Sequence, residues 1–309
     1  MTRTDDAVER LAQALGGGAA AALAAAALIE AELIGQPRFG FDMLAEWSPD
    51  NAPPPEADPA RPVQWLDCRD SFAPLAVAQA VLCLGAAARR NGVAVIFLRG
   101  VRGFGRLAPF VRHLADAGLL AMAGAEGPPF VAPWQGDRPV VGTNPFALAF
   151  GTGDNRVVID IASSATTMAA LRTARATGEA LPAGIALDAG GAPTRIAAEV
   201  AALLPRGGQI GSLLGLIVEI LAGVAGGGRG DPRGRGVFLL ALDPGAHDAP
   251  DWQARLAALK ADWNGAGGHW PGRFALSPDS PLPAAVDERL ASHLARLSGP
   301  HAETADRAK

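Results

Sequence analysis

The chain of 309 residues has no tyrosine and only two cysteines, Cys68 and Cys83, which form no Cys-x-x-Cys motif. So few cysteines exclude a disulfide framework and a thiolate zinc site, and no metal site is predicted. Unpaired cysteines are typical of a reducing compartment, so we expect a cytoplasmic protein. The absence of tyrosine beside abundant alanine and glycine indicates a coding bias rather than a function.

Strong charge of either sign and long apolar runs are missing as well. The formal net charge is −4, with neither the basic stripe of a nucleic-acid-binding protein nor a polybasic segment for an anionic membrane. The opening residues, MTRTDDAVERL, carry acids where a signal peptide needs a basic end and an apolar run. Residues 14–29 are uncharged but too weakly apolar to span a bilayer, and Glu219 interrupts the apolar residues 210–225. We expect neither nucleic acid nor a membrane as a partner.

Hydrophobic residues make up 49% of the chain, enough for a sizeable core. Continuous apolar runs such as VAVIFL are typical of strands buried on both faces. Such runs alternate with helical stretches through the middle of the chain, which favours an α/β fold. Expected strands are residues 63–66, 93–98, 119–123, 139–141, 146–150, 156–161 and 236–242, and expected helices are residues 5–33 with a break near 16–18, 73–90, 109–117, 166–177, 210–221, 251–263 and 284–297.

Both ends of the chain are predicted to be helical and to lack strands. We therefore expect a helical lobe built from residues 1–62 and 245–309, and an α/β lobe built from residues 63–244. Proline-rich residues 36–61 are expected to form a surface connection, because their APPPEADPARP piece can be neither helix nor central strand. Residues 181–195 are expected to be a loop with an Asp-Ala-Gly-Gly turn.

Two glycine-rich segments stand where anionic ligands are often bound. LRGVRGFGRL follows an expected buried strand, but its glycines give GxxGxG instead of the GxGxxG of a dinucleotide-binding turn. Its arginines, Arg99, Arg102 and Arg106, either bind a phosphate or carboxylate or are solvated beside a tight turn. LPRGGQIGS at 204–212 opens an apolar helix, whose free N–H groups and positive dipole end favour anions.

Two polar segments adjoin expected strands. In VGTNP at 141–145, a Thr-Asn pair either faces a ligand or forms a plain turn, and Asn144 is expected to be extended because it precedes proline. Asp160 ends an apolar strand, where an acid either binds a ribose hydroxyl or caps the next helix. HExxH, GxSxG and Cys-His patterns are absent from the sequence, so a hydrolase with an ordinary nucleophile is not expected.

Taken in order, these segments resemble one family over nearly the whole chain, the type 2 malate/L-lactate dehydrogenases. This family includes sulfolactate and ureidoglycolate dehydrogenases and cyclic imino-acid reductases. VAPWQGDRPVVGTNPFALAF resembles its APWGG…GTNPxAFA segment, DIASS its DMATS, and GEALPAGIALDAGGAPT its GEPIPxGWALDxxGxPT. LPRGGQIGSLLGLIVEILAGVAGG resembles its LPLGGHKGYGLALLVEILAGxLxG, residues 235–244 its GHFFxAIDP strand, and His-Trp-Pro-Gly at 269–272 its PGE turn.

The resemblance implies an α/β fold of the malate/L-sulfolactate dehydrogenase kind that is not a Rossmann fold, an extended NADH or NADPH, and usually a homodimer. It implies hydride transfer to or from C2 of a small-molecule substrate, namely a 2-keto acid, a 2-hydroxy acid or a cyclic imine. It also implies cofactor contacts in the two polar segments and at the helix start: Gly142, Thr143, Asn144, Pro145, Asp160, Ile161, Ala162, Gly207, Gly208 and Gln209.

The segment AELIGQPRFGFDML departs from the family's ADLRGxDSHGxxRL. The acid/base histidine of the family falls on Phe39, its carboxylate-binding arginine on Met43, and the histidine of its SNHFG turn on Gly103. Its His-Lys-Gly at the helix start becomes Gln209-Ile210-Gly211. Phe, Met, Gly and Ile side chains neither transfer a proton nor pair with a carboxylate, and losing one acid/base group costs roughly 10²–10⁴ in rate. Malate or lactate chemistry is therefore not expected.

Three functions remain open. One is an oxidoreductase with a retained nicotinamide site and an altered substrate pocket, in which Arg38, Asp42, Arg102 or Gln209 supplies the anchor or the proton. Another is a non-catalytic homologue that serves as a structural or regulatory subunit, in a homodimer or in a hetero-oligomer with a catalytic homologue. The third is a non-redox enzyme on the same fold.

Overall fold

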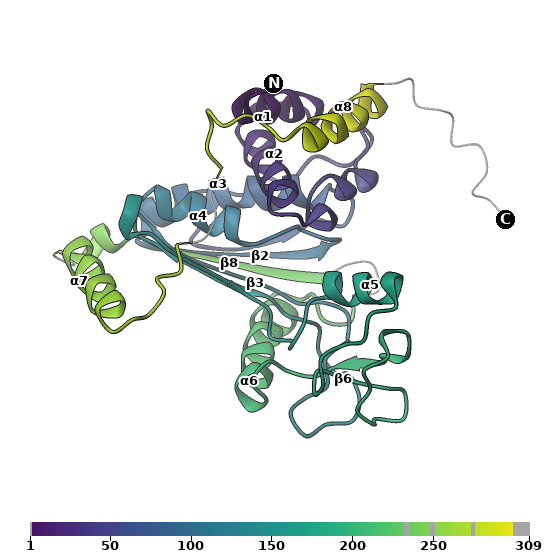
Figure 1. Cartoon of the computed structure of the whole chain (residues 1–309). Helices are drawn as coiled ribbons and strands as arrows, with labels where there is room; N and C mark the ends of the chain where they lie inside the picture. Colours follow the sequence, from purple (N-terminus) through teal and green to yellow (C-terminus); the bar gives the residue numbers. More distant parts are fainter. Residues whose placement is uncertain (1, 232–234, 248–250, 273–275, 299–309) are drawn as a thin grey trace.

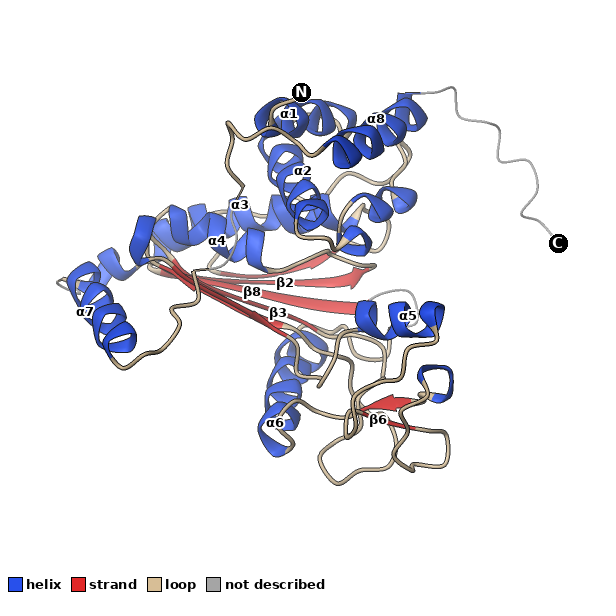
Figure 2. Cartoon of the chain, in the orientation of Figure 1, coloured by secondary structure: helices blue, strands red, loops and turns tan. Residues whose placement is uncertain are grey.

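The computed structural model describes residues 2–231, 235–247, 251–272 and 276–298. One mixed sheet runs through its centre, with strands in the order β1-β2-β8-β3-β4-β5 (Figures 1 and 2). The antiparallel pairing of β8 with β2 and with β3 separates this sheet from the mostly parallel sheet of a Rossmann fold. The strands are β1 (Val63–Asp67), β2 (Val93–Val101), β3 (Leu120–Ala125), β4 (Phe146–Phe150), β5 (Val157–Ile161) and β8 (Arg235–Leu242).

Strand direction brings many strand ends to one edge of the sheet. β1 pairs with β2 in parallel, and β8 runs antiparallel to β2 and to β3. β4 runs antiparallel to β3 and to β5. The carboxyl ends of β1, β2, β3 and β5 therefore lie at the same edge as the amino ends of β4 and β8. The glycine turn after β2, the segment before β4 and the segment after β5 all adjoin this edge.

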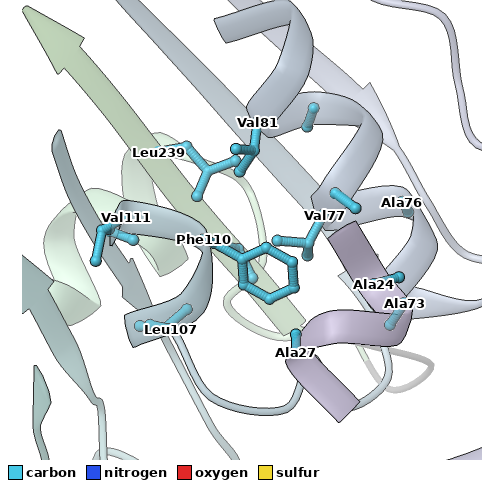
Figure 3. Packing of buried hydrophobic residues seen from close by; sticks show 14 of the residues in the cluster. Ala24, Ala27, Ala73, Ala76, Val77, Val81, Leu107, Phe110, Val111 and Leu239 are labelled. Atoms are coloured by element: carbon cyan, nitrogen blue, oxygen red, sulfur yellow. The ribbon is translucent and has the colours of Figure 1, made fainter. Parts of the chain in front are cut away.

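Helices cover one face of the sheet in two layers. α3 (Ala73–Asn91) and α4 (Ala108–Asp116) pack directly on the strands, and α2 (Gly18–Leu33) packs on α3 (Figure 2). Figure 3 shows the buried ring of Phe110 beside Val77 of α3 and the small alanines of α2. Because alanine lets neighbouring helices approach closely, the alanine-rich segment serves the core.

The helices from the two ends of the chain take different places (Figure 1). α1 (Thr4–Ala14) and α8 (Ala284–Ser298) pack together beside α2. α7 (Trp252–Gly265) instead lies at the far end of the sheet, where the rings of Trp252 and Phe150 are 4.5 Å apart between centroids. One hydrophobic cluster joins α1, α2 and α8 to the sheet. The division into a helical lobe and an α/β lobe stays a prediction.

A second hydrophobic cluster includes residues of α5 (Met168–Thr177) and of a small sheet of β6 (Ala186–Leu187) and β7 (Ala202–Leu203). β6 lies on the side of the central sheet away from α2 (Figure 1). The prediction of a loop throughout 181–195 is wrong at β6, because a two-residue strand is too short to show alternation. The prediction of a strand at 139–141 is also wrong, since the valine at its end makes only an isolated bridge and proline and glycine bound the segment.

α6 (Gln209–Val218) lies on the face of the sheet opposite α3 (Figure 2). The helix predicted at 210–221 is confirmed up to Val218. The chain then continues as a π-helix, Glu219–Ala225, whose turns are wider. Within the described part of the chain, no helix combines the length and the apolar character needed to cross a membrane.

Candidate functional site

Three segments that are far apart in the sequence meet beside the sheet edge: residues 141–145, 160–164 and 204–212. Ser163 joins them, because its N–H and its hydroxyl both donate to the carbonyl of Thr143, at 3.0 and 2.9 Å. The Ser163 carbonyl in turn accepts from the N–H of Arg206 at 2.8 Å. The segments predicted to contact a cofactor thus form one continuous substructure. Sequence reasoning did not single out Ser163, although it lies in the DIASS motif.

Two glycines let the three segments approach each other closely. A Cβ on Gly211 would lie 2.2 Å from the carbonyl oxygen of Arg206 and 2.7 Å from that of Ser163. A Cβ on Gly142 would lie 2.6 Å from the Cα of Gly127. Because these neighbours are backbone atoms, no side-chain rotation could relieve the overlap. Close packing therefore requires glycine at both motif positions.

Asn144 is fully buried and its side chain faces the protein interior. Its Nδ2 donates to the carbonyl of Gly215 and to Oε2 of Glu219, both at 2.9 Å, and its Oδ1 accepts from the N–H of Gly127 at 3.1 Å. The expected extended backbone is wrong, because φ is +33°; asparagine tolerates this conformation, and the three hydrogen bonds hold it. A cofactor contact at Asn144 stays a prediction.

The neighbours of Asn144 differ in their access to solvent. Gly142 is buried, Thr143, Pro145 and Ala162 are half-buried, and Ile161 is 36% exposed. The carbonyl of Pro145 accepts from Ala125 N–H at 3.2 Å, which ties the turn to the end of β3. Of the predicted contacts in these two segments, the half-buried and exposed residues are the ones that can meet a ligand.

Asp160 lies at the end of β5, and its Oδ2 accepts from the N–H of Ala108 at 3.1 Å, at the start of α4. Its side chain is 15% exposed, and the Arg106 Nη2 is 3.9 Å from Oδ2. Of the two roles left open by the sequence, capping a helix is the one seen, although the helix is not the next one along the chain. A ribose contact stays a prediction.

The start of α6 presents an open, glycine-rich backbone. Gly207 and Gly208 have φ of +60° and +65°, and no atom lies within 4 Å of the place a Cβ on Gly207 would take. Gln209 is exposed. The ring of the exposed Trp134, which sequence reasoning missed as a site residue, would lie 3.5 Å from a Cβ on Gly208. The backbone N–H of Trp134 donates to the Ser212 hydroxyl at 3.1 Å.

The first three residues of AELIGQPRFGFDML end α2, and two short 3-10 helices follow, Pro37–Phe39 and Phe41–Glu46. Asp42 is 3.8 Å from Arg38 Nε and accepts from Nη2 of Arg289, of α8, at 3.0 Å. Arg289 Nε also lies 3.1 Å from Glu32 Oε2. The structure thus brings Arg38 and Asp42 together and adds Arg289, which no motif indicated.

The same segment packs against the glycine turn after β2. A Cβ on Gly103 would lie 3.6 Å from the Met43 methyl carbon, and a Cβ on Gly105 would lie 3.5 Å from the Met43 sulfur and 3.4 Å from the Phe39 carbonyl. Arg102 is exposed beside this turn. Phe39, Met43 and Gly103, the positions implied to carry acid/base and anchoring groups, are therefore neighbours in the fold.

The remaining arginines of the glycine turn both pair with carboxylates of this chain but differ in burial. Arg106 is only 12% exposed, and its Nη1 donates to Oε1 of the buried Glu30 at 2.8 Å. Arg99 pairs with Asp67 at 3.2 Å. The prediction of a solvated side chain is wrong for Arg106, which pairs with the buried Glu30, whereas Arg99 is 52% exposed and agrees with it. Ligand binding by these arginines stays a prediction.

Residues 2–272 match the model of a family described as malate/L-lactate dehydrogenase, which is well over half of the 309 residues. The chain belongs to the malate/L-lactate dehydrogenase family. The resemblance inferred from the ordered motifs is thereby confirmed.

Curated relatives in this family carry different activities. Delta(1)-pyrroline-2-carboxylate reductase from Ancylobacter novellus is 36% identical over 62% of this chain and 61% of that protein. (2R)-3-sulfolactate dehydrogenase (NADP(+)) from Chromohalobacter salexigens is 35% identical over 63% of this chain and 62% of that protein. These alignments span less than two thirds of either relative. The name of the second relative includes a nicotinamide cofactor, in agreement with the expected NADH or NADPH.

Solved structures of the family have the same fold. Delta1-piperideine-2-carboxylate reductase from Pseudomonas syringae matches with a TM-score of 0.75 and 26% identity over 96% of this chain and 94% of that one. Sulfolactate dehydrogenase from Methanocaldococcus jannaschii matches with a TM-score of 0.71 over 95% of each chain, at 20% identity. The predicted malate/L-sulfolactate dehydrogenase-like fold is confirmed.

Proposed function

We propose that the chain is an oxidoreductase that uses NADH or NADPH to transfer hydride to or from a C=O or C=N group of a small substrate other than malate or lactate. The observation that carries the proposal is the meeting of residues 141–145, 160–164 and 204–212 at one sheet edge through Ser163. The names of the relatives, which include imino-acid reductases and a sulfolactate dehydrogenase, support the same reaction class.

The residues at the start of α6 fit the anionic part of such a cofactor. The first N–H groups of a helix lack partners within the helix and carry its positive dipole end, which favours a pyrophosphate. Gly207 and Gly208 offer bare backbone with open space in front of Gly207, so a phosphate could approach closely. Trp134 would provide an aromatic wall beside them. The bound cofactor would supply the hydride.

The wall of the proposed substrate pocket is apolar where the family resemblance implies charged groups. Met43 and Phe39 lie against the glycines at 103 and 105, with no ionisable side chain among the four. A substrate that depends on a carboxylate anchor at this point is disfavoured. Arg38, Asp42 and Arg102 are the proposed sources of an anchor or a proton, since they border this wall.

Cofactor binding tests the proposal. NADH and NADPH should each be titrated by fluorescence and by thermal shift, and turnover should then be measured with 2-keto acids and with cyclic imines. We expect binding of at least one cofactor and no turnover of malate or lactate. The absence of binding by both methods would exclude the oxidoreductase and favour the alternative, a non-catalytic homologue that acts as a structural or regulatory subunit.

A second copy of the chain is the proposed partner, because an apolar stripe lies exposed along α6 and the π-helix. Contiguous exposed apolar side chains mark interaction surfaces, and a two-fold dimer pairs such a surface with itself. The stripe recurs every three or four positions, as one helix face does. It comprises Ile210 (79% exposed), Leu213 (51%), Leu216 (47%), Ile217 (51%), Ile220 (49%) and Val224 (62%).

Replacing Ile217 and Ile220 together with glutamate should convert the dimer to a monomer. Two facing copies would bring four carboxylates into an apolar interface, where unpaired charges are strongly disfavoured. Light scattering coupled to gel filtration measures the mass. Leu259→Glu is the control, since Leu259 is 53% exposed on α7, outside the stripe. A dimer that survives the double substitution, or a wild-type monomer, would contradict the proposed interface.

A further inference from the structure

Two glutamates are buried behind the turn at 141–145, and the proposed hydride transfer uses neither. Glu126 directly follows β3, Glu219 begins the π-helix, and each residue is 4% exposed. We infer that Glu126 is a positioning residue of the cofactor site: it shares a proton with Glu219 and thereby locks the turn onto α6. This inference rests on the proposed function, because it takes the turn as a cofactor contact.

A closed ring of contacts connects the two glutamates with the turn. Oε2 of Glu219 accepts from Nδ2 of Asn144 at 2.9 Å, and the same nitrogen donates to the carbonyl of Gly215 in α6. Oδ1 of Asn144 accepts from the N–H of Gly127, the residue after Glu126, at 3.1 Å. Glu126 is next to Gly127 in the chain, and its carboxyl group is close enough to Glu219 for that side chain to raise the pKa of Glu126. We take a hydrogen bond between the two carboxyl groups as the link that closes the ring. A change in that bond therefore acts on Asn144, which sets the turn.

Glycines make room for the Glu126 carboxyl group. Its Oε1 accepts from the N–H of Gly236, in β8, at 3.1 Å. A Cβ on Gly228 would lie 2.3 Å from Oε1, and a Cβ on Gly223, in the π-helix, would lie 2.9 Å from Oε2. The carboxyl group thus lies against bare backbone on two sides. π-helical turns are frequent at functional sites, and this one holds both Glu219 and a glycine that admits Glu126.

Burial raises the pKa of Glu126 to about 7, while the Gly236 N–H lowers it, the neighbouring Glu219 raises it and Arg235 lowers it. The other charged group at the pair is Arg229, which forms an ion pair with Glu219. Below pH 7 Glu126 therefore holds a proton, which it can donate to Glu219. Above pH 7 Glu126 carries a buried negative charge beside the Glu219 side chain, which is unfavourable.

The direction of the pH dependence follows from this arrangement. The pKa of Glu126 in the folded protein lies above its ordinary value of 4.5. The folded state therefore holds more protons than the unfolded state between about pH 4.5 and pH 7, and stability falls as pH rises through that window. As Glu126 loses its proton near pH 7, repulsion loosens the ring and cofactor affinity should fall.

Glu126→Gln tests the inference, because it keeps the shape and an N–H donor for Glu219 but has no titrating proton. Between about pH 6 and about pH 8.5, the wild-type protein should lose at least about fivefold in affinity for NADH or NADPH, and the variant should change by less than about twofold. Fluorescence titration measures both. Glu179→Gln, which removes an exposed carboxylate, is the matched control and should follow the wild type.

Thermal unfolding without cofactor gives an independent readout. The midpoint of the wild type should fall more steeply with pH than that of Glu126→Gln. Parallel pH profiles of the two proteins in both experiments would overturn the inference. If neither cofactor binds at any pH, the proposed function fails, and the thermal profiles alone decide whether Glu126 holds the proton. If the variant does not fold, a wild-type midpoint that stays flat through pH 7 overturns the inference.

Discussion

Replacing Glu30 with glutamine is expected to lower the free energy of unfolding by about 3–5 kcal/mol. The Glu30 carboxylate is fully buried, and its Oε1 accepts from Arg106 Nη1 at 2.8 Å and from Arg112 Nη1 at 3.2 Å. The side chains of the two arginines are only 12% and 10% exposed. Glutamine keeps the shape but removes the charge, so two nearly buried cations lose the carboxylate that they share. Urea unfolding followed by circular dichroism measures the loss.

Asp5→Asn is the matched control for Glu30→Gln. It also removes a carboxylate paired with an arginine, but Arg3 and Asp5 have 51% and 46% of their side chains exposed. An exposed pair contributes about 0–1 kcal/mol, and added salt screens it, whereas a buried cluster is screened much less. A loss of under about 1 kcal/mol for Glu30→Gln would place it with such exposed pairs and contradict the argument.

Much of the fold could be predicted because its signals are local. The continuous apolar runs VAVIFL and GVFLLAL predict strands, and both lie in interior strands of the sheet, β2 and β8. The position of β8 between β2 and β3 could not be predicted, because pairing depends on contacts between distant segments. The π-helix that begins at Glu219 could not be predicted for another reason. Its residues are as apolar as those of the α-helix before it, so the sequence does not show where one kind of helix ends and the other begins.

The candidate site shows the same division between local and distant contacts. The family resemblance implied that the segments around Gly142 and Gly211 contact one cofactor, because their motifs occur in the order that the family has. They did not predict the direction of side chains such as Asn144, which is set by Gly127 and Glu219. Arg289 reaches Asp42 across 247 positions, so no local pattern could have shown it.

Gly211→Ala is expected to destabilise the protein by about 3 kcal/mol and to abolish cofactor binding. The new Cβ would lie 2.2 Å from the Arg206 carbonyl oxygen and 2.7 Å from that of Ser163. Both are backbone atoms, so the start of α6 has to move away from residues 160–164. That movement separates two of the three segments whose meeting supports the proposed function. Chemical unfolding and NADH or NADPH titration measure the two effects.

Two further glycine substitutions make the Gly211→Ala argument quantitative. At Gly215 the added Cβ would lie 3.0 Å from the Ser163 hydroxyl oxygen and 3.3 Å from the Ser163 Cβ, a milder overlap that a small shift relieves, so Gly215→Ala should give a smaller loss of about 1 kcal/mol. Gly265, the last residue of α7, has no atom within 4 Å of its added Cβ, so Gly265→Ala should be neutral or slightly stabilising. Because alanine is the better helix former at all three positions, only steric overlap predicts this order of effects. Equal effects at Gly211 and Gly265 would mean that the close approach of α6 to Ser163 does not hold the site together.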